Sequence, residues 1–258
     1  MILIVSVLVG LVVGSYLGCL VYRLPRNKDT VWSRSRCVNC NHILSWKDLI
    51  PVFSFMWLRA KCRYCKKGLS KSYPIIEIVT ACLFLLSTIF ISNLGILSIF
   101  YSWILISLLV AVAFVDLFNF LILDKIIISG FVVSLVAIFL TKFGVSLDII
   151  CSNLSCGWLD SFLGVLFFAG ILGTIFLISS GQWIGFGDVK LAIWIGFLFG
   201  FPRIINVFYF TFFLGALVGI LLLIFRKADR KTPLPLGTFI VVASIFLLIF
   251  PINLLPQF

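Results

Sequence analysis

Long apolar stretches, separated by short polar segments, run through this chain from one end to the other. A helix that crosses a bilayer needs about 20 largely apolar residues, and about eight stretches of that kind occur. They lie at 1–22, 74–92, 95–115, 121–141, 158–180, 189–201, 204–225 and 236–254. The stretch at 189–201 is short, so we expect it either to be tilted or to continue an interfacial segment near Trp183. The pattern predicts an all-α polytopic membrane protein with about eight transmembrane helices.

The composition excludes a water-soluble domain of this size. Of the 258 residues, 62% are hydrophobic and 11% are charged, a balance far more apolar than that of soluble globular proteins. The first 22 residues carry no basic segment before the apolar run and no small-residue cleavage site after it. We therefore expect them to form a retained transmembrane helix rather than a cleaved signal peptide.

Positive charge is concentrated between the first two apolar stretches. The net charge is +11, and 12 of the 20 lysines and arginines lie within 23–73. Loops rich in Lys and Arg stay in the cytoplasm during insertion, so we predict a cytoplasmic loop there and an outside N-terminus. Alternation then places 116–120, 181–188 and 226–231 in the cytoplasm as well. Anionic lipid of the inner leaflet is the expected partner of this charge, and nucleic acid is not expected.

These features divide the chain into three predicted parts. They are a first transmembrane helix at 1–22, a cytoplasmic basic loop at 23–73, and a membrane core of about seven helices at 74–258. The loop is the one segment outside the predicted spans that reaches the size of a small domain.

Two C-x-x-C motifs lie inside the basic loop. They are Cys37-Val-Asn-Cys40 and Cys62-Arg-Tyr-Cys65, and 21 residues separate them. This spacing is typical of a tetrahedral zinc site with four cysteine ligands, and the neighbouring basic residues favour the thiolate form that binds metal. Four protein sulfurs leave no position for water, so we predict a structural zinc rather than a catalytic one. A redox-active or unliganded set of thiols is the alternative.

The single histidine and the other four cysteines lie outside the two motifs. His42 follows the first motif and is expected to be an exposed loop residue, with a role as substitute ligand as the alternative. Cys19 and Cys82 lie in apolar stretches and are expected to be packing residues. Cys151 and Cys156 fall in a predicted outward loop, where the sequence leaves open whether they form a disulfide.

Carboxylates are scarce in this chain, so the position of each one is informative. Only nine are present, and an ionisable group costs roughly 2.5–3.5 kcal/mol at the centre of a spanning helix. Groups retained in or near such helices usually face a cavity and have a role. The carboxylates that qualify as candidates are Glu77, Asp116, Asp124 and Asp188.

Asp116 and Asp188 are the candidate catalytic pair. Asp116 closes one span, Asp188 precedes another in the motif GFGDVK, and the predicted topology places both at the cytoplasmic edge. Two carboxyl groups brought together there would share one proton, because like charges at short distance do not both ionise readily. The ionised group would then activate water while the protonated group polarises a scissile carbonyl. Gly185 and Gly187 lack side-chain bulk, so we expect an extended substrate backbone to approach Asp188 closely.

Each aspartate also has an interpretation without catalysis. Asp116 alone fits an interfacial carboxylate that reaches toward the lipid headgroups. Asp188 alone fits a glycine turn in which the aspartate caps the following helix. Neither residue by itself decides between these interpretations and the catalytic one.

An ordered series of motifs covers nearly the whole chain. The series consists of GSYLGCLVYRLPR at 14–26, the two cysteine motifs, SWKDLIPVFSFMWLRAKC at 45–62, SKSYPIIEIVTA at 70–81, Asp116, GFGDVK at 185–190 and PLPLGTF at 233–239. Together these residues resemble the type IV prepilin peptidases, the bifunctional leader peptidases and N-methyltransferases of pilus, competence and type II secretion systems.

The resemblance assigns residues to an activity. Asp116 and Asp188 match the catalytic aspartates of the family. The supporting positions that match family residues are Asp124, Gly185, Gly187, Lys190 and Glu77. The implied reaction is hydrolysis after the glycine that ends a short basic leader, on the cytoplasmic side of a bacterial inner membrane. Methylation of the new N-terminus by S-adenosylmethionine is implied to follow, with prepilins or pseudopilins as substrates and pilus or secretion machinery as partners.

The chain departs from the family pattern at three places. Leu123 replaces the proline before Asp124, Gly18 replaces an asparagine, and the first cysteine motif lacks its common proline. None of these changes removes a predicted catalytic group. Gly18 lies in the N-terminal half, where the methyl-transfer function is usually placed, and no glycine-rich nucleotide fingerprint marks a methyl-donor site.

Three other functions are alternatives. A related intramembrane aspartyl protease for other signal peptides would use the same two aspartates, but the cysteine loop argues against it. An ion-coupled transporter or channel would use the buried carboxylates to bind cations or relay protons, and it would not need the loop. A non-catalytic scaffold would use the cysteine loop as a docking module for a cytoplasmic partner.

Overall fold

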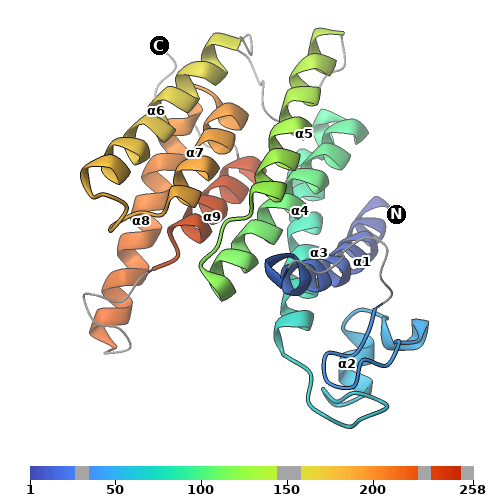
Figure 1. The fold of residues 1–258 in the computed structure, drawn as a ribbon. Coiled ribbons are helices and arrows are strands. Elements are labelled where there is room, and N and C mark those ends of the chain that lie inside the picture. Colours follow the sequence, from blue (N-terminus) through green and yellow to red (C-terminus); the bar gives the residue numbers. More distant parts are fainter. Residues whose placement is uncertain (27–34, 144–157, 226–233, 251–258) are drawn as a thin grey trace. The chain divides into compact units, whose positions relative to one another are not determined.

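The computed structural model describes residues 1–26, 35–143, 158–225 and 234–250 (Figure 1). The helices are α1 (Ile2–Arg23), α2 (Phe53–Trp57), α3 (Ser72–Ile91), α4 (Ile96–Asn119), α5 (Asp124–Lys142), α6 (Trp158–Ile178), α7 (Phe186–Phe199), α8 (Arg203–Ile224) and α9 (Leu236–Ile249). Over these described ranges, β pairing is limited to two isolated antiparallel bridges. The predicted all-α fold is confirmed.

Every helix except the short α2 coincides with one of the predicted apolar stretches. Six of the described helices are long and apolar enough to cross a membrane, while α7 and α9 have 14 residues each. Large apolar side chains are exposed on the outside, including Leu221 and Ile224 of α8, as expected where lipid is the solvent. The chain is therefore a multi-pass membrane protein. Its six long apolar helices, together with α7 and α9 in the described ranges, agree with the predicted number of about eight.

The chain folds as two compact units, Met1–Ser92 and Asn93–Phe258. The first contains α1 to α3 with the two cysteine motifs, and the second contains α4 to α9. These units follow packing, whereas the predicted division at residues 22 and 73 follows membrane topology. That topological division stays a prediction.

In the first unit, a stripe of glycines allows α1 to pack closely on α3. Gly10 and Gly14 lie four residues apart on α1, so they share one face of the helix. A Cβ at Gly10 would lie 2.7 Å from Ala81 Cα, and one at Gly14 would lie 2.7 Å from Glu77 Cα. Small residues at this spacing let transmembrane backbones approach each other. The sequence GSYLG thus serves packing as well as matching a family motif.

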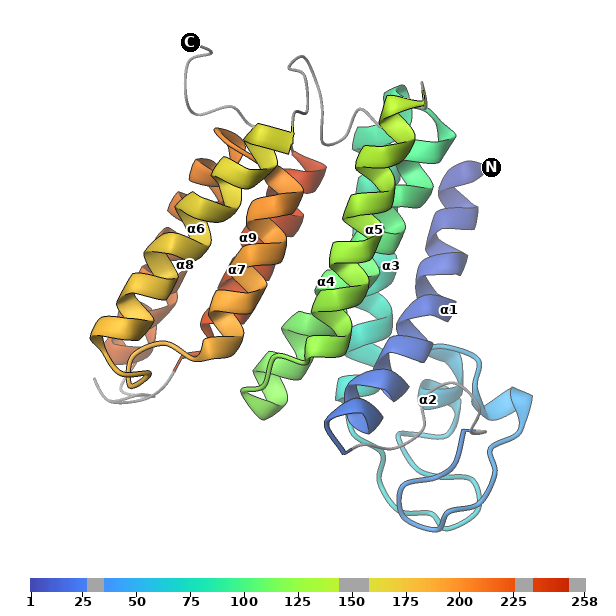
Figure 2. The same ribbon diagram turned by 45° about the horizontal axis from the view of Figure 1, so that its top comes forward.

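In the second unit, α7 is the central helix. It packs against α5, α6, α8 and α9, and its Trp194 and Ile195 are fully buried. The closest approach is to α6, where a Cβ on Gly196 would lie 2.7 Å from Gly164 O; Figure 2 shows the two helices side by side. The helix α4 packs against α5 and α9. These contacts bring the end of α4 to the beginnings of α7 and α9.

Candidate active site and metal centre

Asp116 and Asp188 lie at helix ends within the second unit. Asp116 belongs to the last turn of α4, which stops at Asn119 where Phe120 adopts a left-handed conformation with φ 52°. Asp188 is the third residue of α7. The start of α9 joins them, because the backbone of Gly237 and Thr238 contacts both aspartates.

The Asp116 carboxyl is buried, with 4% of the residue exposed. Its Oδ2 accepts a hydrogen bond from the Thr238 N–H at 2.7 Å and another from the Thr238 hydroxyl at 2.9 Å. A free backbone N–H in the first turn of a helix favours a negative group. The first turn of α9 therefore supplies both donors that hold Asp116.

Asp188 is partly buried and has donors from two helix starts. The Gly185 N–H donates to Asp188 Oδ2 at 3.2 Å, and the Gly237 N–H also donates to the Asp188 carboxyl. The Asp188 carboxyl interacts electrostatically with that of Asp116. The consecutive N–H groups of Gly237 and Thr238 in α9 thus donate to Asp188 and Asp116, respectively. The Asp188 carboxylate therefore caps the start of α7 and also interacts with Asp116, and the catalytic role of the pair stays a prediction.

Gly237 and Thr238 were missed by reasoning from individual residues. A Cβ at Gly237 would lie 3.0 Å from Asp116 Oδ2 and 2.8 Å from Ile122 Cδ1, so only glycine fits without displacement of its neighbours. The one signal in the sequence was the motif PLPLGTF, which contributed to the resemblance without suggesting a role for these two residues. The fold gives them a role, since they bring both carboxyl groups to one place.

The glycines before Asp188 have different surroundings. Gly185 is exposed, whereas a Cβ at Gly187 would lie 3.0 Å from Ile122 Cβ. Gly187 therefore makes room for the α4–α5 connection of the protein itself. The room predicted for a substrate backbone stays a prediction, and Gly185 is the glycine whose exposure agrees with it.

Lys190 and Asp124 form an ion pair with each other. Lys190 Nζ lies 2.7 Å from Asp124 Oδ1, with 34% and 60% of the side chains exposed. The pair links α7 to the first residue of α5. A pair this exposed contributes at most about 1 kcal/mol. Its geometry supports a role in fixing the beginnings of these two helices beside the aspartates.

Glu77 lies in the first unit rather than in the unit that holds the aspartate pair. It is 7% exposed on α3, and its Oε2 accepts the Val52 N–H at 2.7 Å. The Ser15 hydroxyl of α1 also donates to this carboxylate. Glu77 therefore ties α1 and the segment before α2 to α3.

The four cysteines of the two motifs come together. Their sulfurs all lie within 4.8 Å of one another, and Cys37 Sγ is 3.9 Å from Cys65 Sγ. Zinc–sulfur bonds of about 2.3 Å in a tetrahedron place sulfurs about 3.8 Å apart. The donor set and its spacing therefore fit a tetrahedral metal ion with four thiolates.

The two cysteine motifs share one backbone conformation. The Cys37 N–H donates to His42 O, and the Cys62 N–H donates to Lys67 O, each at 2.9 Å. Asn41 and Lys66 occupy matching left-handed positions, with φ 55° and 60°. Each turn aims its thiols at a common point. The His42 ring instead packs on Tyr64, with ring centroids 3.7 Å apart, and His42 is exposed, as predicted.

Cys37 and Cys40 differ in how readily their thiols ionise. Burial opposes ionisation of Cys37, but the N–H groups of Cys40 and Asn39 and the thiols of Cys62 and Cys40 lower its pKa to about 7. A backbone hydrogen bond from His42 lowers the pKa of Cys40. Burial and the neighbouring Cys37 and Cys65 thiols outweigh this effect and raise that pKa to about 11. A thiolate at Cys37 is the form that a metal ion binds.

The segment between the motifs is fixed by Asp48. Arg63 Nε lies 2.8 Å from Asp48 Oδ1, and the Ser45 N–H and hydroxyl donate to Oδ2 at 3.1 and 2.8 Å. Burial opposes the charge, but the Ser45 donors and the Arg63 guanidinium together lower the pKa of Asp48 below its usual value. This carboxylate therefore holds the second motif to the segment before α2.

The remaining cysteines are not gathered at this centre. Cys19 is partly buried on α1, and Cys82 is exposed on α3. Cys151 and Cys156, for which a disulfide was left open, lie outside the described residues.

A multi-pass membrane protein with two interacting carboxyl groups at its helix ends has the arrangement of an intramembrane aspartyl peptidase. Comparisons with known proteins agree. Residues 8–91 match the model of the bacterial peptidase A24 N-terminal domain, and residues 103–220 match that of the type IV leader peptidase family. These ranges fall in the first and second units respectively.

Three proteins that are similar to this chain carry the same description. A prepilin leader peptidase/N-methyltransferase of Bacillus subtilis is 34% identical over 237 residues, which cover 92% of this chain and 89% of the relative. Proteins with this description from Aeromonas hydrophila and Pseudomonas aeruginosa are 26% and 27% identical, over 92% and 93% of this chain and 87% of each relative. No solved structure gives a significant match. The chain belongs to the type IV leader peptidase family, as its motifs predicted.

Proposed function

We propose that this protein removes the leader from type IV prepilin-like proteins and methylates the new N-terminus. Relatives described as prepilin leader peptidase/N-methyltransferase support both activities, since they match almost the full length of this chain. The observation that carries the peptidase assignment is the contact of the first turn of α9 with both Asp116 and Asp188.

The proposed chemistry uses one proton shared by the two carboxyl groups. The ionised group takes a proton from water, whose oxygen attacks the scissile carbonyl carbon, while the protonated group donates its proton to the carbonyl oxygen. Collapse of the tetrahedral intermediate breaks the C–N bond. The leaving amine takes up the proton that came from water, and one hydroxyl of the intermediate returns its proton to the carboxyl group that had donated one, which restores the pair. The backbone donors of Gly185, Gly237 and Thr238 hold the carboxyl groups in place, so little rearrangement accompanies the reaction.

The position of the reaction is proposed from charge and resemblance. The basic segment at 23–73 favours the cytoplasmic side of a bacterial inner membrane, and the turn after Asp116 and the turn before Asp188 are expected on that side. Cleavage after a glycine, prepilin or pseudopilin substrates and contact with pilus or secretion machinery follow from the family. The same family match favours prepilins over the signal peptides of other intramembrane proteases.

We also propose that Cys37, Cys40, Cys62 and Cys65 hold one structural zinc ion. The spacing of the sulfurs supports a tetrahedral ion with no open position. Its role is then to hold the two motifs together. For the second activity, S-adenosylmethionine supplies a methyl group that an amine can accept.

Processing of a co-expressed prepilin tests the peptidase assignment. Asp116→Asn and Asp188→Asn are each expected to lower the rate of leader removal by about 10²–10⁴-fold, because each removes a proton-transfer group. Asp160→Asn, the same change at the start of α6 in the same unit, is the matched control and should process normally. Normal processing by either pair variant, at equal amounts in the membrane, would contradict the assignment.

A further inference from the structure

An uncharged run of ten residues, 49–58, lies inside the segment that the sequence predicts to be a cytoplasmic loop. It contains α2, and the charged residues Asp48 and Arg59 stand at its two ends. A run of this length is too short to cross a bilayer, so it either packs inside the protein or lies at the membrane interface. These alternatives predict different surroundings for α2.

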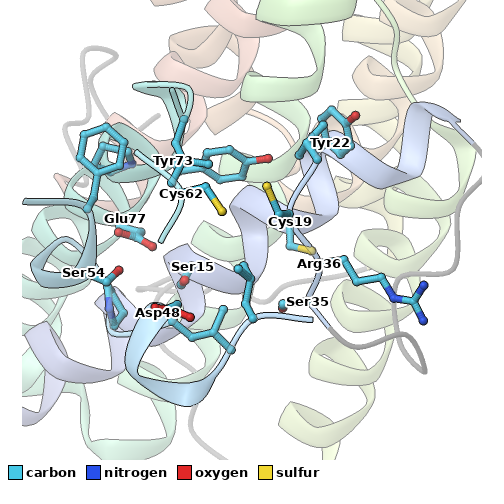
Figure 3. Close-up of a pocket in the computed structure, with 18 of the residues that line it drawn as sticks. Ser15, Cys19, Tyr22, Ser35, Arg36, Asp48, Ser54, Cys62, Tyr73 and Glu77 are labelled. Carbon is cyan, nitrogen blue, oxygen red and sulfur yellow. The ribbon is translucent and has the colours of Figure 1, made fainter. Parts of the chain in front are cut away.

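One face of α2 is turned toward the protein. Ser54 and Phe55 line a pocket of about 980 Å³ in the first unit, and α1, α3 and the cysteine motifs supply its other walls. Figure 3 shows Ser54 there, together with Ser15 of α1 and Glu77 of α3. The helix α2 therefore forms part of the pocket wall beside Glu77.

The opposite face of α2, called the exposed face below, is apolar. Phe53, Met56 and Trp57 are spaced so that they lie on one side of a helix, and they are 60%, 71% and 75% exposed. The rings of Phe53 and Trp57 stack, with centroids 6.0 Å apart. Large apolar side chains that are exposed together mark a surface that contacts a partner or a membrane.

Hydrogen bonds place the beginning of α2 beside the transmembrane helices rather than beyond their ends. The Val52 N–H donates to Glu77 Oε2 at 2.7 Å, and the Ser15 hydroxyl donates to the same carboxylate. Ser15 lies eight positions before Arg23, where α1 ends, and Glu77 lies five positions after Ser72, where α3 begins. At 1.5 Å per residue, these positions are about 12 Å and about 8 Å inside the two helices. Interfacial segments enter a leaflet to a comparable depth of about 5–10 Å.

The backbone around α2 is suited to a lipid environment because its N–H groups are paired. Those of Ser54, Met56 and Leu58 each donate to the carbonyl four residues earlier, at 3.1, 3.0 and 2.9 Å. Val52 precedes the helix in a left-handed conformation with φ 59°, and Glu77 accepts its N–H. Lipid offers no hydrogen-bond partner to a backbone group. The buried carboxylate of Glu77 thus supplies the acceptor that the start of α2 needs.

The charge at the ends of the run fits a bilayer surface. Lys47 and Arg59 are exposed on either side of it, and Lys47 Nζ lies 5.5 Å from the centroid of the Trp46 ring. Basic and aromatic side chains are favoured where the hydrocarbon meets the headgroups. Residues 35–71 contain eight lysines and arginines but a single carboxylate, Asp48. Anionic lipid headgroups complement this charge.

We propose that the exposed face of α2 is embedded in the bilayer leaflet at this end of α1 and α3, with Lys47 and Arg59 at the level of the headgroups. The pocket beside Glu77 then lies at the membrane surface, and α2 separates it from the lipid. The inference is independent of both activities of the proposed function. A protein partner is the alternative occupant of the exposed face, but it would not account for the depth of Val52 or for basic residues at both ends of the run.

Tryptophan fluorescence of the full chain in lipid nanodiscs tests this placement. The chain has seven tryptophans, so the emission of Trp57 is obtained as the difference between the unchanged protein and Trp57→Phe, which keeps an aromatic ring. Lipids brominated near the headgroup end of the acyl chains quench a tryptophan that they contact, whereas iodide quenches one in water. We expect brominated lipid to remove about half or more of the Trp57 emission and iodide to remove about a tenth or less.

Trp103→Phe is the matched control. Trp103 is buried on α4 of the second unit, so its emission, obtained in the same way, should change little with either quencher. Trp57 emission that brominated lipid leaves unchanged would overturn the proposal, and quenching by iodide would then show that the exposed face lies in water. Failure of the proposed function looks different, since a chain that cleaves no prepilin would still show the quenching of Trp57 by lipid.

Discussion

Thr238 shows how a residue remote in sequence holds a candidate catalytic carboxyl group in place. It lies 122 positions from Asp116, yet its N–H and its hydroxyl both donate to Asp116 Oδ2. Scarcity of charge in an apolar chain was enough to identify Asp116 and Asp188 as candidates. Thr238 could not be found in the same way, because threonine is common in membrane helices and only the packing of α4 on α9 gives this one a partner.

Thr238→Val should lower the rate of leader cleavage by about 10–100-fold. The substitution keeps the side-chain shape but removes a hydrogen bond to a charged group, which contributes about 1.5–3 kcal/mol. Thr238→Ser keeps the hydroxyl and should restore most of the rate. Single-turnover cleavage of a purified prepilin gives both values, and equal rates for the valine and serine variants would refute this role of the hydroxyl.

The helices of this protein were predictable because lipid imposes a simple pattern on them. Runs of apolar residues placed each spanning helix to within a few residues, but they did not show that α7 begins at Phe186, before the apolar run. The sequence GFGD resembles a loop in composition. The hydrogen bond from the Gly185 N–H to the Asp188 carboxylate caps the helix, so its first turn includes these residues. Helix ends depend on such local contacts, to which average hydrophobicity is insensitive.

The close packing of α1 on α3 makes Gly14 intolerant of a side chain. In Gly14→Ala the new Cβ would lie 2.7 Å from Glu77 Cα, so the helices must separate. We expect a loss of about 1–3 kcal/mol in the free energy of unfolding. Gly170→Ala on α6, where nothing lies within 4 Å of the added Cβ, should be neutral or slightly stabilising. Thermal unfolding in nanodiscs measures both, and equal stability of the two variants would contradict the packing argument.

The cysteine segment should depend on its metal ion. Cys62→Ser removes one of four ligands, so we expect a lower yield of folded protein and a metal content well below one zinc per chain. Cys82→Ser, a cysteine exposed on α3 outside the cluster, is the control and should keep its zinc. Elemental analysis of protein purified without chelator decides the question, and unchanged protein free of metal would refute the zinc site.

At the scale of the whole molecule, the candidate residues lie in two compact units. The first unit carries the cysteine cluster and the pocket beside Glu77, and the second carries the aspartate pair. The sequence led to both sets of residues, since spacing identified the cysteines and the family motif identified Glu77. It did not show that Glu77 lines a pocket, because the lining comes from segments far apart in the chain. The outside N-terminus and the cytoplasmic loop remain predictions from charge alone.

The central claim is that Asp116 and Asp188 act as one unit, and a double-variant cycle tests it most directly. Single-turnover cleavage of a prepilin would be measured with purified Asp116→Asn, Asp188→Asn and the protein carrying both changes. Groups that share one proton lose their function together, so we predict that the double variant is no slower than the slower single variant. Rate losses that multiply in the double variant would show that the two carboxyl groups act independently, and would contradict the account.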